Sequence, residues 1–152
     1  MGATFTGRDK MLEEYQIEYE LVNAEGIAFI CYRCSMGKLT TGVGHRVDSE
    51  CGPITLEYMG KLLKEDIKVA RDGLMRNVPC FPGLSDARQL VLICMAFQLG
   101  IKGLLGFKKM LLALENGAFV TASNEMLDSK WARQCPKRAK RLAEFMRKGV
   151  LE

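Results

Sequence analysis

A carboxylic acid placed directly before a glycine is the first feature of this sequence that could carry out chemistry. Glu25 precedes Gly26, and it falls where a predicted helix over about residues 9–23 gives way to a predicted β-hairpin. A general acid must hold its proton near neutral pH, and apolar neighbours at such a junction favour the protonated form. Glu25 is therefore a candidate general acid that would face a cleft.

The other reactive side chains are thiols and a single imidazole. The sequence has one histidine, His45, and six cysteines. Cys31 and Cys34 have the spacing of a redox or metal-binding pair, but no second such pair completes a zinc site, so we expect no metal and no other cofactor. Because residues 1–10 lack the apolar segment of a secretory signal, we expect reduced thiols in a cytoplasm rather than disulfides.

Hydrophobic periodicity predicts the elements that would position Glu25. The apolar stripe of the helix over 9–23 is predicted at Leu12, Tyr15, Tyr19 and Val22. Two short runs, 27–32 and 38–43, flank Gly37 and predict the hairpin that follows.

The remainder of the chain has the pattern of helices. Thr55 is a plausible N-cap for a long helix over about 55–76, whose apolar stripe consists of Leu63, Ile67, Ala70 and Leu74. Ser85 begins the next helix, which is apolar on every side over 90–97 and marks a buried centre. Glycines at 100, 103 and 106 interrupt it, and further helices are predicted over about 108–115, 118–127 and 136–148.

These elements predict an α+β, mainly helical protein. A small β-hairpin lobe over about 12–54 would be joined by the long helix 55–76 to a larger helical lobe over about 78–149, within a single domain over 1–152. A cleft between two such lobes is a natural ligand site. No apolar stretch of 18 residues occurs in the sequence, so we expect no membrane span.

Positive charge is concentrated near the C-terminus. Between Ser129 and Gly149 the sequence has eight basic residues and one acidic residue, Glu144. Such a cluster favours a polyanionic partner, which could be nucleic acid, an anionic membrane surface or the bacterial wall. A solvated helix face is the simpler interpretation, and charge alone does not choose among these.

A longer succession of motifs resembles a known family. After Glu25-Gly26 the family signature continues through Thr40-Thr-Gly-Val-Gly44-His45. The later matching segments are Ile54-Thr55, Asp66, Arg76-Asn77, Phe97-Gln98-x-Gly100, Gly103, Gly106-Phe107, Ser129-x-Trp131 and Pro136-x-Arg138-Ala139. In this order, over roughly residues 12–149, the sequence resembles the phage-type lysozymes, the T4-lysozyme-like endolysins of glycoside hydrolase family 24. The resemblance implies a lysozyme-like fold.

The resemblance also implies an activity and the residues that carry it. The expected enzyme is a muramidase that hydrolyses the β-1,4 bond between N-acetylmuramic acid and N-acetylglucosamine in bacterial peptidoglycan. Glu25 matches the general acid that protonates the leaving oxygen. Cys34 and Thr40 match the two residues that position or activate water on the opposite face of the sugar, which would invert the anomeric carbon.

Cys34 departs from the family pattern, in which most members have Asp at this position and some endolysins have Cys. A thiol with a reference pKa of about 8.5 is only about a few per cent thiolate at pH 7. Three hypotheses remain open. Cys34 could ionise beside a cation and act as base, stay neutral and orient water, or attack the sugar and give net retention. An inert structural cysteine is the alternative to all three.

Other matched positions are assigned supporting roles by the resemblance. His45 is expected to pair with Asp66 on the long helix, a structural contact rather than a catalytic one. Arg138 matches the arginine that contacts the acid's carboxyl, and we expect it to orient Glu25. The remaining substrate-binding or supporting positions are Gly44, Phe97, Gln98 and Trp131, of which Trp131 could be mainly a core anchor.

Other functional classes are weaker alternatives. A catalytically impaired, lysozyme-like module that only binds peptidoglycan is the chief rival. A thiol hydrolase using Cys34 and His45 has no further motif in its support. A nucleic-acid binder would rest on the basic C-terminal segment alone, because no recognised binding motif accompanies it.

The expected cellular setting follows from the resemblance and the missing signal. A monomeric endolysin would wait in the host cytoplasm and reach the periplasmic or extracellular wall through a holin-type pore or a secretion machine. A virion-associated enzyme and an injected antibacterial effector are further possibilities, and the sequence does not distinguish them.

Overall fold

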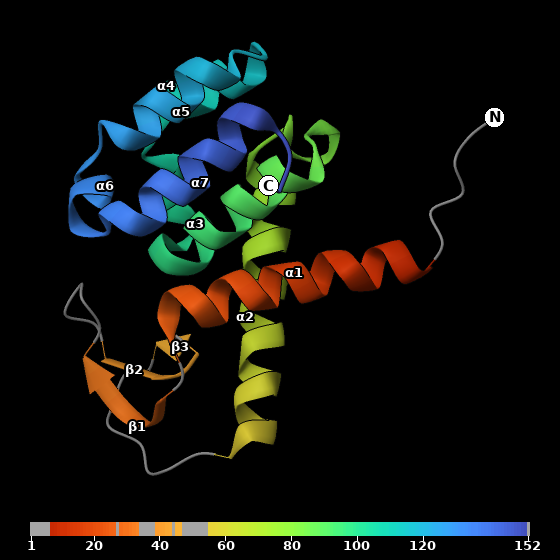
Figure 1. Ribbon diagram of the computed structural model, residues 1–152, viewed down its shortest axis with the longest axis vertical. Coiled ribbons are helices and arrows are strands. Elements are labelled where there is room, and N and C mark those ends of the chain that lie inside the picture. The colour runs from red at the N-terminus through yellow and green to blue at the C-terminus, as the bar shows by residue number, and fades with distance from the viewer. Residues whose placement is uncertain (1–6, 27, 34–38, 44, 47–54, 152) are drawn as a thin grey trace. The chain divides into compact units, whose positions relative to one another are not determined.

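The computed structural model describes residues 7–26, 28–33, 39–43, 45–46 and 55–151. The chain forms two compact units, Met1–Lys64 and Glu65–Glu152. Each is described by itself (Figure 1). The described part of the chain is mainly helical, as predicted.

Helix α1, Gly7–Glu25, is longer than predicted and ends at the residue of greatest chemical interest. Gly26 stops it with φ 71°, a left-handed conformation that glycine adopts at little cost. The Gly26 amide donates to the Val22 carbonyl at 2.8 Å. Glu25 is therefore the last helical residue and is held in place by the cap behind it.

The predicted apolar stripe of this helix was partly wrong. Ile17 and Leu21 are buried, at 0% and 2% exposed, whereas Tyr19 is 49% exposed. Leu12 and Tyr15 lie in a stretch whose side chains are outside the described residues. Exposing Ile or Leu to water costs more free energy than exposing Tyr, because the Tyr hydroxyl can form hydrogen bonds with water. Ile17 and Leu21 therefore form the buried face of α1.

A small antiparallel sheet follows, with strand order β1-β2-β3. Its strands are β1 Ala28–Arg33, β2 Leu39–Gly42 and β3 His45–Arg46. Ala28 pairs with Gly42, and the register shifts before Tyr32 pairs with Thr40. Residues 34–38, predicted to turn the hairpin, lie outside the described residues, so the β-hairpin lobe as a whole stays a prediction.

Helix α2, Leu56–Asn77, has the cap and the buried face that the sequence predicts. The Tyr58 amide donates to Thr55 Oγ1 at 3.2 Å, which confirms Thr55 as the N-cap. All four residues of the predicted stripe are at most 7% exposed: Leu63, Ile67, Ala70 and Leu74. The boundary between the two compact units falls within this helix, after Lys64.

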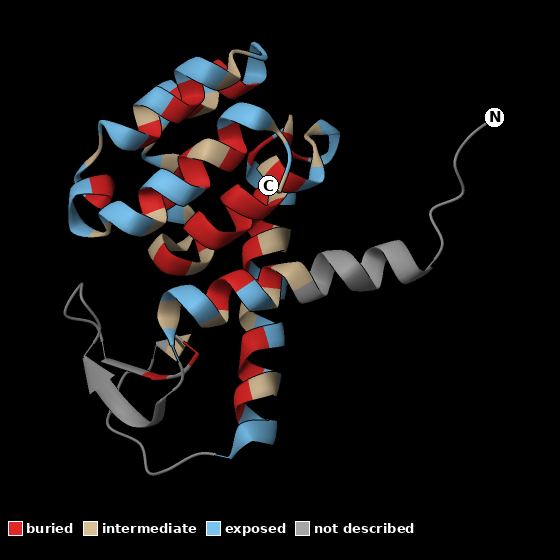
Figure 2. Cartoon of the chain, in the orientation of Figure 1, coloured by how far each residue is buried: buried red, intermediate tan, exposed pale blue. Residues whose placement is uncertain are grey.

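Helix α3, Asp86–Leu105, forms the core of the second unit. Its N-cap is Ser85, whose side chain accepts from the Arg88 amide, as predicted. Every residue from Leu90 to Ala96 is buried, as Figure 2 shows in red. By length and composition α3 could cross a membrane, but ten of its residues are buried, which is typical of a core helix. Gly100 interrupts it with φ 76°.

Short elements surround α3. The helices α4 Lys108–Glu115, α5 Phe119–Leu127 and α7 Pro136–Lys148 agree closely with the predicted ranges. Two elements were not predicted: the 3-10 turn Phe81–Gly83 and the helix α6, Lys130–Gln134. Five residues are too few for a periodic pattern, although Ser129 caps α6 by accepting from the Ala132 amide at 3.1 Å.

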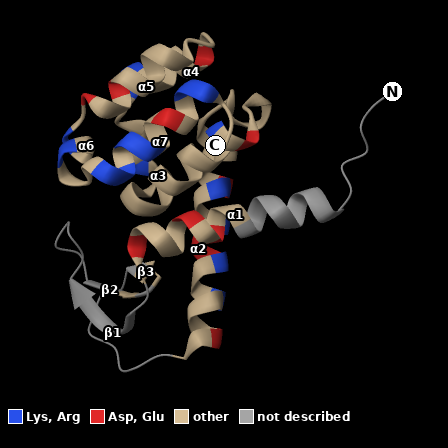
Figure 3. Cartoon of the chain, viewed as in Figure 1, with Lys and Arg blue, Asp and Glu red and all other residues tan. Residues whose placement is uncertain are grey.

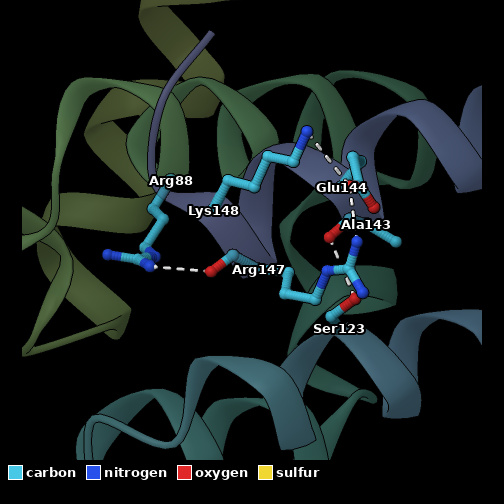
Figure 4. A network of polar contacts seen from close by, with 6 residues as sticks. All are labelled: Arg88, Ser123, Ala143, Glu144, Arg147 and Lys148. Atoms are coloured by element: carbon cyan, nitrogen blue, oxygen red, sulfur yellow. Dashed lines mark hydrogen bonds and ion pairs between the residues drawn. The ribbon is translucent and has the colours of Figure 1, made fainter. Parts of the chain in front are cut away.

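The C-terminal end of α7 is fastened by Arg88, which projects from the first turn of α3 (Figure 4). Arg88 Nε donates to the Met146 carbonyl at 2.8 Å, and a terminal nitrogen donates to the Arg147 carbonyl at 3.2 Å. The guanidinium also lies over the Phe119 ring, 3.4 Å from its centroid. These contacts satisfy carbonyls that have no partner within α7 itself.

Candidate active site

Glu25 is the last residue of α1, directly before the chain enters the sheet. Its side chain is half-buried. Strand β1 begins three residues later, at Ala28, which pairs with Gly42 near the end of β2. The cap at Gly26 fixes the direction in which the chain leaves the helix, so the backbone position of Glu25 is tied to this end of the sheet.

Thr40 lies in the central strand of the sheet. It pairs with Tyr32 of β1 and with Arg46 of β3. Gly42, the partner of Ala28, is two residues further along β2, about 7 Å at the rise of an extended strand. The register therefore places Gly42 opposite the start of β1, whereas Thr40 lies opposite Tyr32, near the end of that strand. Cys34 and Gly44, the other predicted site positions of this unit, lie outside the described residues.

His45 and Asp66 belong to different units. His45 begins β3, pairs with Thr41 across the sheet and is half-buried. Asp66 is a half-buried residue of α2, two positions beyond the unit boundary. The expected contact between them stays a prediction.

In the second unit, Gln98 and Trp131 form a buried polar pair. Trp131 Nε1 donates to Gln98 Oε1 at 2.8 Å, and the two residues are 4% and 9% exposed. The Phe107 ring meets the indole edge to face, with centroids 6.2 Å apart. This environment favours the core-anchor interpretation of Trp131, because a buried indole offers no open ring to a sugar.

Cys135 completes this cluster and was not singled out from the sequence. Gln98 Nε2 donates to Cys135 Sγ at 3.8 Å, and that thiol donates to the Trp131 carbonyl at 3.1 Å. The residue links the end of α6 to Pro136, the first residue of α7. Its position directly before a helix-starting proline was the only signal in the sequence.

The remaining predicted supporting residues lie near this cluster in sequence. Phe97 precedes Gln98 on α3 and is half-buried. Arg138 lies in the first turn of α7 and is also half-buried. Glu25 and Arg138 come from different units, so the arginine's contact with the acid stays a prediction. Among the described residues, no group of three His, Cys, Asp or Glu side chains could hold a metal ion.

Three cysteines lie in the second unit. Cys80, Cys94 and Cys135 form no disulfide with one another, and Cys94 is buried within α3 as the sequence predicts. Burial raises the pKa of the Cys80 thiol above its ordinary value. Cys31, Cys34 and Cys51 lie in stretches whose side chains are outside the described residues.

Comparison with known proteins identifies relatives for most of the chain. The family described as phage lysozyme matches residues 22–148. Probable T4-type lysozyme 1 of Dictyostelium discoideum is 31% identical over 115 residues, which cover 72% of this chain and 68% of that protein. Probable T4-type lysozyme 2 of the same organism is 24% identical over 155 residues, covering 84% of this chain and 91% of that protein.

A further relative is a much longer protein. The pre-baseplate central spike protein of Enterobacteria phage T4 is 30% identical over 117 residues, which cover 75% of this chain. The match occupies 20% of the spike protein. The similarity therefore concerns one segment of that protein and says nothing about its other parts.

Proposed function

This chain belongs to the phage lysozyme family, and on that premise we propose that it is a muramidase in which Glu25 is the general acid. Membership implies a lysozyme-type glycoside hydrolase that acts on peptidoglycan. The bond proposed to be cut is the β-1,4 linkage between N-acetylmuramic acid and N-acetylglucosamine. The observation that carries the proposal is the position of Glu25 as the last residue of α1, capped by Gly26 at the entrance to the sheet.

The proposed reaction begins with proton transfer from Glu25. Its carboxyl gives its proton to the glycosidic oxygen as the bond from that oxygen to the anomeric carbon breaks. The developing oxocarbenium ion is attacked from the opposite face by water, which loses a proton to a base. The products are a reducing muramic acid end and a new hydroxyl on the leaving sugar, with the anomeric centre inverted.

Cys34 and Thr40 are proposed to act on the attacking water. Support comes from the family match, which spans both positions, and from the place of Thr40 in the central strand of the sheet. As a thiolate, Cys34 would accept the proton of the water; as a neutral thiol, it would only orient it. A retained β-product, observed by NMR of the first-formed anomer, would instead indicate attack by Cys34 on the sugar.

The test compares Glu25→Gln with Glu115→Gln on purified sacculi. Glu115 is a matched control because it is also the last residue of a helix, α4, and is exposed. Loss of a general acid should lower the initial rate of sacculus digestion between about a hundredfold and about ten-thousandfold, whereas the control should stay within about twofold. Thermal unfolding of both variants shows whether each is folded. Digestion by Glu25→Gln at the wild-type rate would contradict the proposal.

Mass spectrometry of the released muropeptides identifies the bond. Reducing-end muramic acid is expected for a muramidase, and reducing-end glucosamine would contradict the assignment. A binding module is the second candidate, motivated by the substitution at Cys34. It predicts that the wild-type protein sediments with sacculi without releasing any product.

A further inference from the structure

The cations of α6 and α7 form a surface that the proposed chemistry does not use. We define the basic surface as the exposed residues Lys130, Arg133, Lys137 and Lys140. Figure 3 shows blue segments along both helices. None of the four makes an ion pair within the described part of the chain, so their charges are available to an external anion.

The other end of α7 is different. Glu144 binds Arg147 and Lys148 there, with its carboxylate 3.3 Å from Lys148 Nζ (Figure 4). The hydrogen bond from Arg147 holds the pKa of Glu144 below its ordinary value. The single carboxylate offsets one of these two positive charges, whereas the four cations of the basic surface have no anionic partner among the described residues.

Helix stability explains little of the basic surface, because only Arg133, in the last turn of α6, lies where the helix dipole favours a cation. Lys137 lies in the first turn of α7, and neither α6 nor α7 has an acidic residue in its first turn. Cations at this end of a helix are repelled by the helix dipole. Like charges three residues apart on one helix, such as Lys137 and Lys140, also repel, which favours an interaction outside the chain.

The apolar face of α7 fixes the orientation of these cations. Ala139, Leu142, Ala143, Phe145 and Met146 are buried, so α7 is anchored in its own unit and leaves its charged face to solvent. Trp131 is buried as well. The two helices therefore expose no aromatic ring on which single-stranded bases could stack, and a single-stranded nucleic acid is disfavoured as the partner.

We propose that the basic surface binds the phosphate headgroups of an anionic lipid bilayer. Charge complementarity supports this partner, because point charges spread over two helix faces suit a broad layer of phosphates better than a single small anion. The binding would be peripheral, since the apolar residues of α7 stay in the core. The inference does not depend on the proposed acid, because it concerns attachment and not bond cleavage.

Sedimentation with lipid vesicles tests the proposal without any peptidoglycan. The intact protein should bind phosphatidylcholine vesicles containing about 30% phosphatidylglycerol and should not bind pure phosphatidylcholine. The variant Lys130→Gln/Arg133→Gln/Lys137→Gln/Lys140→Gln should bind at least about tenfold more weakly. Added salt should weaken the wild-type interaction, as expected for exposed charges.

The matched control removes four exposed lysines elsewhere: Lys61→Gln/Lys64→Gln/Lys102→Gln/Lys109→Gln. It has the same net charge as the first variant and should retain binding within about threefold. Equal losses in both variants would overturn the proposal, because net charge alone would then explain the binding. Failure of the wild-type protein to bind the anionic vesicles at low salt would also overturn it.

Two further measurements check that the variant is folded and that the partner is lipid rather than nucleic acid. The basic-surface variant should unfold at a temperature no lower than the wild type, because it loses mutually repelling cations. If it were unfolded, the single variants Lys137→Gln and Lys140→Gln would be compared with Lys102→Gln instead. Tighter binding to a short DNA duplex than to the vesicles, lost in the same variant, would assign the surface to nucleic acid and overturn the proposal.

Discussion

Two buried hydroxyl groups, one in each unit, have different surroundings. Ser123 on α5 is 4% exposed, and its Oγ donates to the Ala143 carbonyl of α7 at 2.9 Å. Thr41 in β2 is 2% exposed, and its Oγ1 has no hydrogen-bond partner among the described residues. Buried polar groups are usually paired, so the Ser123 hydroxyl follows the general rule and the Thr41 hydroxyl departs from it.

The difference indicates what each unit is built to do. In the helical unit, the buried side chains of Gln98, Ser123 and Trp131 all have internal partners. In the sheet, Thr41 follows Thr40, a proposed site residue, along β2, with the two side chains on opposite faces of the strand. Proteins tend to break the rules of stability at functional sites and to obey them elsewhere. Three substitutions test whether the paired and unpaired groups contribute differently to the free energy of unfolding.

The largest effect is expected at the buried pair of Gln98 and Trp131. Gln98→Leu leaves the indole N–H buried without an acceptor and should lower the free energy of unfolding by about 2–3 kcal/mol, measured in urea. Asn116→Ala is the control, because Asn116 Nδ2 donates to the Leu112 carbonyl at an exposed site; its expected cost is below about 0.5 kcal/mol.

A double-mutant cycle sharpens this test. Combining Gln98→Leu with Trp131→Phe removes donor and acceptor together, so the double variant should lose less than the sum of the single variants. Strict additivity would mean that the hydrogen bond contributes nothing to stability.

A smaller loss is expected at Ser123. Ser123→Ala removes the link between α5 and α7 and should lower the free energy of unfolding by about 1 kcal/mol. Thr121→Ala, on the same helix but exposed, should change it much less. If Ser123→Ala cost no more stability than Thr121→Ala, the hydrogen bond of Ser123 would not stabilise the helical unit, and the contrast with Thr41 would be contradicted.

The smallest effect, with the opposite sign, is expected at Thr41. Thr41→Val replaces an unpaired hydroxyl by a methyl group of similar shape, and it should raise the free energy of unfolding by up to about 1 kcal/mol. Exposed Thr121→Val is the control and should be close to neutral. If Thr41→Val destabilised the protein, the Thr41 hydroxyl would have a hydrogen-bond partner after all, and the contrast with Ser123 would be contradicted. A more stable variant that digests sacculi more slowly would show that the unpaired hydroxyl serves the site.

Local signals in the sequence were sufficient for most helices. The caps at Thr55 and Ser85 and the proline at 136 marked helix starts because they act on the backbone beside them. The stripe of α1 was partly wrong because Tyr19, which can expose its hydroxyl to water, was counted among the apolar positions. Helix α6 was not predicted because its five residues form little more than one turn, too short for a periodic pattern.

The candidate site was predictable to a different extent. The position of Glu25 at a helix end before Gly26 was predicted from residue types alone, and α1 does end at Glu25, while its role as the acid stays a prediction. The roles of Cys34, Thr40 and Arg138 came from resemblance, since they depend on contacts between distant parts of the chain. The link from Cys135 to Gln98 spans 37 residues, and no local pattern could have indicated it.

The grip of Arg88 on α7 has a mechanical consequence. Its partners Met146 and Arg147 lie 58 and 59 residues further along the chain. A force applied behind Gly149 would therefore be transmitted through the guanidinium to the first turn of α3 before α7 could unwind. Gly149 packs closely against Arg88, since a methyl group at position 149 would lie 2.7 Å from the guanidinium carbon. A tether or fusion attached at this end would pull on the core of the helical unit.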